Sequence, residues 1–124
     1  MILKIGQKKM KANELMIGDI VTWKGNICYV ISVENLGGLV GVENEKFCEL
    51  VSDKELEPIP LTEEILKANE LNPIICCNLS MPKWYMSLRS GNRHVEMSFK
   101  YVHQLQHALR LCGLNELADN FKIE

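Results

Sequence analysis

The fold is decided by residues 20–33, IVTWKGNICYVISV, in which two runs rich in β-branched and aromatic side chains flank Gly25-Asn26. Such runs favour strands, and a glycine–asparagine pair between them favours a hairpin. Shorter runs of the same kind predict further strands at residues 15–17, 39–42 and 47–51. Gly37-Gly38 predicts a reversal of the chain before the second of these. Short strands joined by glycine-rich turns indicate a small curled sheet or barrel.

The opening at residues 18–21, GDIV, resembles that of SH3-like barrels.

A helix and a second sheet are expected after this strand-rich half. Pro58 and Pro60 cannot donate ladder hydrogen bonds, so they mark a connection. Thr62 is a suitable N-cap, and Glu63 and Glu64 suit the positive end of the helix dipole. The sequence therefore predicts a helix that ends near residues 69–71. Two or three antiparallel strands are expected beyond it, among residues 74–77, 84–88 and 94–99.

The chain closes with helical periodicity. Residues 101–112 predict a helix, Gly113 predicts its end, and apolar residues three and four apart predict a short final helix at residues 114–121. Leu105 and Leu109 lie on the apolar face of the first of these helices and are expected in the core. The expected fold class is α+β, with an SH3-like small-barrel N-terminal half, a helix, a short antiparallel sheet and two C-terminal helices.

Length and composition favour a single domain. The chain has 124 residues, of which 47% are hydrophobic and 24% charged. We expect one compact domain over residues 1–124, with a β-rich part at 1–57 and an α/β part at 58–124 that share a core. No stretch approaches the roughly 18 apolar residues of a membrane-spanning helix. The apolar residues at the N-terminus precede the basic ones, unlike a secretory signal. A cytoplasmic protein without a membrane partner is therefore expected.

The cysteines indicate free thiols. Their number is odd and no Cys-x-x-Cys pair occurs among Cys28, Cys48, Cys76, Cys77 and Cys112. Buried thiols in a reducing compartment are therefore expected, with no disulfide and no bound cofactor. Cys76-Cys77 is an unsuitable redox pair, because adjacent residues of a strand point to opposite faces.

The net charge of −2 conceals an uneven distribution. Residues 1–11 carry four lysines and no acid, whereas residues 34–70 carry ten acids against three lysines. This acidic middle argues against a surface that binds nucleic acid over its whole extent, and it leaves room for a local basic patch. The run from Glu43 to Glu64 is expected to be a solubilising face. The alternative is a mimic of nucleic acid that attracts a basic partner.

Four short segments carry a family resemblance: residues 11–15, KANEL; 17–19, IGD; 56–66, LEPIPLTEEIL; and 101–113, YVHQLQHALRLCG. Together they resemble a group of small uncharacterised proteins of gut Bacteroides-type bacteria and their phages and mobile elements. The similarity covers most of residues 10–71 and 100–124, and residues 72–99 diverge. Met10-Lys11 resembles the usual start of such proteins, so residues 1–9 are an upstream start or an appended strand. The resemblance implies common ancestry, and it implies no substrate, cofactor or catalytic residue.

His103 and His107 have the spacing with which two histidines on a helix hold zinc in metalloproteases. Gln104 stands where such enzymes need a glutamate as general base, and the pattern offers no third ligand. Both histidines project about 160° from Leu105, beside Arg110, which places them on the solvated face of the helix. Exposed histidines or a partner-facing surface are therefore expected. A metal site and a metal-dependent hydrolase are the alternatives.

Residues 82–94 form a basic hairpin with interleaved aromatic residues and no acid. Its candidate contacts to nucleic acid are Lys83, Tyr85, Arg89 and Arg93, since cations neutralise phosphates and aromatic rings stack on bases. Trp84, Met86 and Leu88 alternate with these residues and are expected to face the core. A solvated hairpin is the simpler interpretation.

No motif for catalysis emerges from the sequence. It contains no glycine-rich phosphate loop, no Ser/His/Asp set and no Cys/His nucleophile pattern. We therefore expect a non-catalytic accessory protein of phage or mobile-element origin that binds another macromolecule, most simply a protein. Binding of nucleic acid through the hairpin at residues 82–94 is the alternative.

Overall fold

The structure is a computed structural model that describes residues 10–71, 75–78, 83–90 and 93–123. For residues 75–78, 83, 85–90 and 93–97 it describes the backbone alone. The chain divides into two compact units, unit 1 at Met1–Ile59 and unit 2 at Pro60–Glu124. The division lies two residues from the one expected between residues 57 and 58. A core shared by the two parts stays a prediction.

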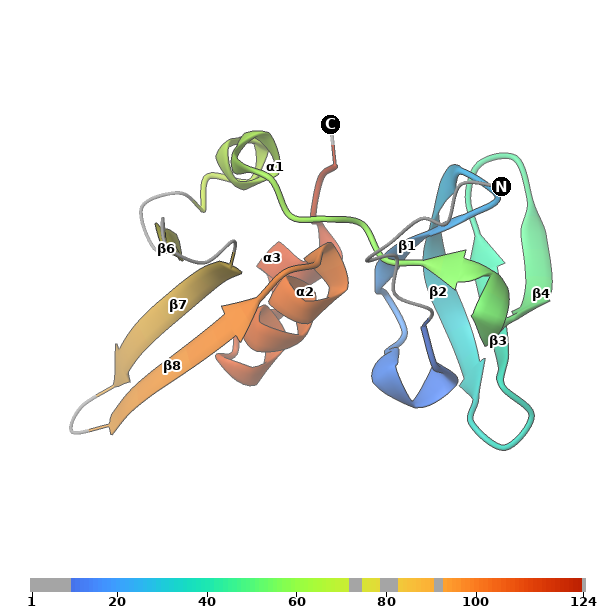
Figure 1. Ribbon diagram of the computed structural model, residues 1–124, viewed down its shortest axis with the longest axis horizontal. Helices are drawn as coiled ribbons and strands as arrows, with labels where there is room; N and C mark the ends of the chain where they lie inside the picture. The colour runs from blue at the N-terminus through green and yellow to red at the C-terminus, as the bar shows by residue number, and fades with distance from the viewer. Residues whose placement is uncertain (1–9, 72–74, 79–82, 91–92, 124) are drawn as a thin grey trace. The chain divides into compact units, whose positions relative to one another are not determined.

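Unit 1 is a curled half-barrel of five strands (Figure 1). Its elements are the 3-10 turn η1 (Ala12–Glu14), β1 (Ile20–Trp23), β2 (Asn26–Glu34), β3 (Leu39–Glu43), β4 (Cys48–Ser52), the 3-10 turn η2 (Asp53–Glu55) and β5 (Leu56–Glu57). The strand order is β4-β3-β2-β1-β5, and the neighbours pair antiparallel. The predicted small curled sheet is thus confirmed. The last strand, β5, falls where the sequence predicted only a connection.

The expected strand at residues 15–17 is wrong, because this segment forms a turn that leads into β1. The Asp19 carboxylate accepts the Met16 N–H at 2.8 Å, and the Gly18 N–H donates to the Val30 carbonyl at 2.7 Å. Asp19 is fully buried. Its side chain therefore holds the turn through the short-range hydrogen bonding that favours aspartate in such positions.

The predicted hairpin of β1 and β2 is confirmed, with its turn shifted by one residue. Trp23 pairs with Asn26, so the two loop residues are Lys24 and Gly25. Their φ angles are 49° and 79°, and a two-residue hairpin of this type needs a positive φ at both positions. The Asn26 side chain donates hydrogen bonds to the Trp23 and Lys24 carbonyls, and these bonds stabilise the turn.

The core of unit 1 is built from inward-facing residues of its strands and from three residues that precede β1. Its buried members are Met10, Ala12, Leu15, Val21, Cys28, Val30, Val40, Val42, Val51 and Leu56. Burial raises the pKa of the Cys28 thiol to about 11, so Cys28 stays protonated and acts as a small apolar residue. Cys48 is exposed, which corrects the expectation of a buried thiol there. The thiols of Cys28, Cys48 and Cys112 are free.

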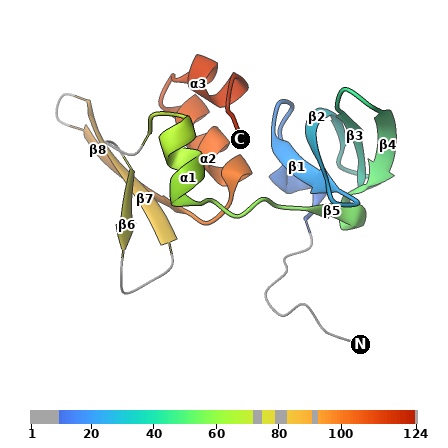
Figure 2. The same cartoon turned by 90° about the horizontal axis from the view of Figure 1, so that it is seen from above.

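Unit 2 joins helices to a three-stranded antiparallel sheet. Its elements are α1 (Glu63–Ala68), β6 (Ile75–Asn78), β7 (Lys83–Ser90), β8 (Arg93–Phe99), α2 (Val102–Leu111) and α3 (Asn115–Asp119). The strand order is β6-β7-β8, and Figure 2 shows the three helices of this unit on one side of these strands. These elements confirm the α+β class and the predicted helices. No described helix is long and apolar enough to cross a membrane.

Local contacts attach α1 to the sheet of unit 2. The Thr62 hydroxyl accepts the Ile65 N–H at 3.3 Å, which confirms the predicted N-cap. The Leu61 N–H donates to the Lys100 carbonyl at 2.9 Å, and the Trp84 indole N–H donates to the Leu61 carbonyl at 3.0 Å. The Trp84 face of β7 is therefore the face that meets the segment leading into α1.

Helices α1 and α2 end in the same way, with different residues at the critical position. The Leu71 N–H bonds to the Leu66 carbonyl at 2.9 Å, and the Leu114 N–H bonds to the Leu109 carbonyl at 2.8 Å. In both ends the preceding residue has a positive φ, 79° at Gly113 and 56° at Glu70. This C-terminal motif favours glycine at that position, which confirms the predicted end at Gly113 and makes Glu70 the exception.

Replacing Glu70 by glycine is expected to raise the free energy of unfolding by about 1 kcal/mol, because glycine relieves the strain of the left-handed conformation. Gly113→Ala is the reciprocal control and is expected to lower it by a similar amount. An added Cβ at Gly113 meets nothing within 4 Å, so no clash with a neighbouring residue contributes to the effect of this variant. Urea unfolding followed by circular dichroism gives both values. A loss of stability in Glu70→Gly would show that contacts of the Glu70 side chain outweigh the strain.

Candidate functional site

Three exposed large apolar side chains gather on the outer face of the half-barrel. Tyr29, Ile31 and Leu50 are 44%, 38% and 62% exposed, respectively. They alternate along β2 and β4 with the buried residues Val30 and Val51, so they lie on the face opposite to the core. We call these three residues the outer patch.

A bulge in β2 and a glycine in β3 shape the surface between Ile31 and Leu50. The register of β2 on β3 shifts between Val30 and Ser32, which leaves Ile31 as the extra residue. Gly41 lies between the bulge and Leu50, with which it pairs on β4. A Cβ at Gly41 would collide with Ser32 Oγ and lie 3.2 Å from Ile31 Cγ1. Side-chain atoms of Ser32 and Ile31 therefore fill the space that a side chain on β3 would take.

Acidic residues border the outer patch. Glu43 pairs with Tyr29 and Glu34 ends β2, and both glutamates are exposed on the outer face. Residues 10–59 carry nine acidic and four basic side chains. An apolar surface with an acidic surround attracts cationic partners and repels phosphate.

Asp53 belongs to the acidic run that the sequence assigned to a solubilising face, yet it has a structural role. Its carboxylate accepts the Ala12 N–H at 2.9 Å, and its own N–H donates to the Gly38 carbonyl at 2.8 Å. It therefore ties the segment before β1 and the turn before β3 to the end of β4. These contacts support the two strands that carry the outer patch.

The prediction that His103 and His107 lie on a solvated face of α2 is wrong for His103. His103 is only 2% exposed, and its ring stacks on Tyr101 with the ring centroids 6.0 Å apart. His107 is half-buried and meets His103 edge to face. The helical projection assumed one covered face, whereas α3 covers a second side of α2. The Gln106 amide donates to the Ala118 carbonyl there at 3.0 Å.

Gln104, which stands where a metalloprotease needs its base, has a structural role. Its side-chain oxygen accepts the Lys100 N–H at 2.8 Å and the Tyr101 N–H at 3.2 Å, so it caps the first turn of α2. In the part of the chain that the structure describes, no group of three or more His, Cys, Asp or Glu side chains is placed to hold a metal ion.

The basic hairpin of the sequence is present as the backbone of β7 and β8. Tyr85 pairs with Ser98 and Arg89 pairs with His94. Tyr85 and Arg89 thus hold register positions opposite to the Trp84 face of the sheet. The side chains of Lys83, Tyr85, Arg89 and Arg93 lie outside the described residues, as do those of Cys76 and Cys77. Residues 1–9, expected as an upstream start or an appended strand, also lie outside them.

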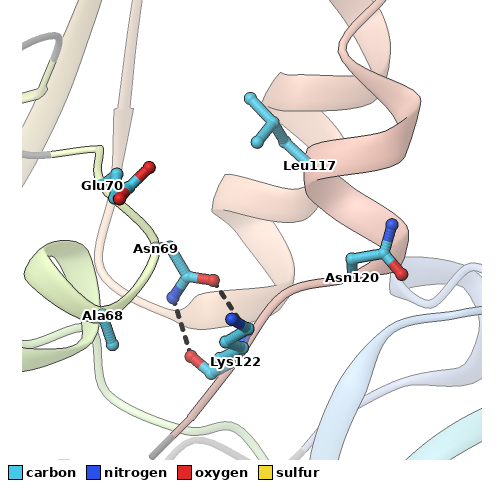
Figure 3. A pocket seen from close by; sticks show the side chains of 6 residues that line it. All are labelled: Ala68, Asn69, Glu70, Leu117, Asn120 and Lys122. Carbon is cyan, nitrogen blue, oxygen red and sulfur yellow. Dashed lines mark hydrogen bonds between the residues drawn. The ribbon is translucent and has the colours of Figure 1, made fainter.

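A pocket of about 270 Å³ lies in unit 2 and is lined by Ala68, Asn69, Glu70, Leu117, Asn120 and Lys122 (Figure 3). The Asn69 amide donates to the Lys122 carbonyl at 2.7 Å, and its oxygen accepts the Lys122 N–H at 2.7 Å. This pairing attaches the C-terminal segment to the end of α1. No histidine, cysteine or serine is among the lining residues, so the pocket presents no thiol or hydroxyl nucleophile and no imidazole base.

The outer patch is thus the candidate site, and the sequence had not singled it out. Its residues lie in predicted strands, but strand propensity alone does not show which face of β2 is open after the bulge. Comparison of the chain with protein-family models, with curated proteins and with solved structures found no match.

Proposed function

We propose that this chain is a non-catalytic binding module, an accessory protein of phage or mobile-element origin, and that its outer patch binds another protein. We further propose that unit 1 is an SH3-like barrel. Two features support that assignment: β5 pairs beside β1, and the 3-10 turn η2 separates β4 from β5. Small barrels of this type carry many unrelated functions, so the function rests on the site.

The outer patch is the observation that carries the proposal. Single exposed apolar residues are common on protein surfaces, whereas a contiguous group with a polar surround is typical of a binding site. Tyrosine is also among the residues that contribute most to interfaces. The surrounding glutamates favour a partner that is basic around an apolar centre.

Leu50→Asp is expected to weaken partner binding by at least about tenfold, because it places a charge at the centre of the contact. Leu36→Asp is the matched control, since Leu36 is fully exposed in the turn between β2 and β3, outside the outer patch. The full chain is immobilised, and a protein retained from a lysate of its host is identified and purified. Calorimetry then gives Kd for the original chain and both variants. Equal affinities of the two variants would overturn the proposal.

Nucleic-acid binding through β7 and β8 is the second candidate, favoured by the register positions of Tyr85 and Arg89 opposite to the Trp84 face. The same immobilised chain is therefore tested for retention of DNA and RNA at increasing salt. Retention that falls with salt and is lost when Lys83, Arg89 and Arg93 are replaced by alanine would favour this candidate. Retention of protein alone would count against this candidate, and the comparison of Leu50→Asp with Leu36→Asp then tests whether that protein binds the outer patch.

A further inference from the structure

Strand β4 is an edge of the half-barrel, and it borders the outer patch. It pairs with β3 on one side, and no described strand pairs with its other side. Cys48, Glu49 and Leu50 are all exposed along it. An edge strand of this kind presents backbone donors and acceptors to which another extended segment can pair.

The hydrogen bonds at both ends of β4 show which backbone groups face the open side. The Asn44 N–H donates to the Phe47 carbonyl at 2.9 Å, and the Asp53 N–H donates to the Gly38 carbonyl at 2.8 Å. Bonded and non-bonded pairs alternate in an antiparallel ladder. With the printed register, the intervening bonded pairs are those of Glu49 with Val42 and of Val51 with Val40. The N–H and carbonyl groups of Cys48 and Leu50 therefore point to the open side.

We infer that β4 binds an extended segment of the partner protein as an additional antiparallel strand. This inference rests on the proposed function and names the partner's chemistry. The partner residue opposite Leu50 forms both backbone bonds with it and places its side chain on the outer patch. The residue opposite Val51 meets the core face, and the residue opposite Glu49 meets a carboxylate. The segment therefore carries, from N to C, two apolar residues and then a lysine or arginine.

Glu49 indicates whether the segment that pairs with β4 is cationic or comes from a second copy of the chain. Glu49 lies on the same face of the sheet as the buried residues Val42 and Val51, but its position on the edge strand leaves it exposed. A charge at such a position on an edge strand disfavours pairing with apolar strands and with its own copy. The excess of acidic residues in residues 10–59 also disfavours association of the chain with a second copy. The occupant is therefore a basic segment of another protein.

The probe is a synthetic peptide in which valine, leucine and lysine, in that order, are flanked by threonines. We expect saturable binding to the full chain, with slower hydrogen exchange at the amides of Cys48 and Leu50 in NMR spectra. The amides of Glu49 and Val51 already bond to β3 and are expected to change little. Methylation of the backbone nitrogen of the peptide's leucine removes its hydrogen bond to the Leu50 carbonyl and is expected to abolish binding. Methylation of the backbone nitrogen of the peptide's lysine, which faces away from β4, is expected to have little effect.

Charge is tested on the chain with a matched pair of variants. Glu49→Lys is expected to weaken peptide binding by about tenfold, because repulsion replaces attraction across the strand pair. Glu45→Lys makes the same change at an exposed residue outside β4 and is expected to leave the affinity unchanged.

Each result separates the inference from the proposed function. Peptide binding that shifts the signals of the outer patch without protecting the Cys48 and Leu50 amides would overturn strand addition and leave the outer patch as a docking site. Absence of peptide binding, or association of the chain with itself through β4, would also overturn the inference. Failure of Leu50→Asp to weaken binding of the natural partner would overturn the proposed function itself.

Discussion

Replacing Leu105 by alanine is expected to lower the free energy of unfolding of unit 2 by about 2–5 kcal/mol. Leu105 is fully buried at the centre of α2. Alanine there removes apolar contacts and leaves a cavity in a well-packed interior, and the loss includes both terms. Urea unfolding followed by fluorescence measures the change. The chain has two tryptophans, Trp23 in unit 1 and Trp84 in unit 2, so a Trp23→Phe background reports unit 2 alone.

Leu111→Ala is the matched control for Leu105→Ala. It makes the same change of side chain at the last residue of α2, where Leu111 is 79% exposed. The expected effect is within about 0.5 kcal/mol. Equal effects of the two substitutions would show that the buried face of α2 is assigned wrongly.

Replacing Leu56 by alanine is expected to destabilise unit 1 by about 2–5 kcal/mol. Leu56 is 1% exposed and belongs to the core cluster of the half-barrel. It pairs with Trp23 at the end of β1, so the same substitution also weakens the closure of β5 on the sheet. Trp23 fluorescence in a Trp84→Phe background measures the unfolding of this unit.

The control for Leu56→Ala is Leu50→Ala, the same substitution on a strand of the same unit where the side chain is 62% exposed. It is expected to change the free energy of unfolding by no more than about 0.5 kcal/mol. A small effect of Leu56→Ala would mean that β5 contributes little to the core, and it would count against the proposed SH3-like barrel.

Gln104 and His103 show where prediction from periodicity ends. The projection of α2 correctly placed Leu105 and Leu109, because apolar spacing depends only on helix geometry. It placed His103 on the solvated side, and it could not show which groups Gln104 binds. Gln104 in fact caps the backbone at Lys100 and Tyr101, and His103 is buried against Tyr101. Both outcomes depend on the path of the chain before and after the helix, which the projection does not include.

The outer patch shows that prediction from sequence has a similar limit for strands. The sequence predicts strands over Tyr29, Ile31 and Leu50 from their composition alone. The face that these residues occupy depends on the bulge at Ile31 and on the room above Gly41. A shift of one residue exchanges the two faces of a strand, so alternation cannot be assigned without the register.

The sequence by itself determined the features that depend on residues within about four positions of one another. These are the Thr62 cap, the end of α2 at Gly113, the hairpin of β1 and β2 and the α+β class. Tertiary structure alone decided the pairing of Leu56 with Trp23, the burial of His103 and the exposure of Leu50 beside an open edge. The physical reason is distance along the chain. Local hydrogen bonds and propensities act between near neighbours, whereas pairing and burial are set by segments brought together from far apart.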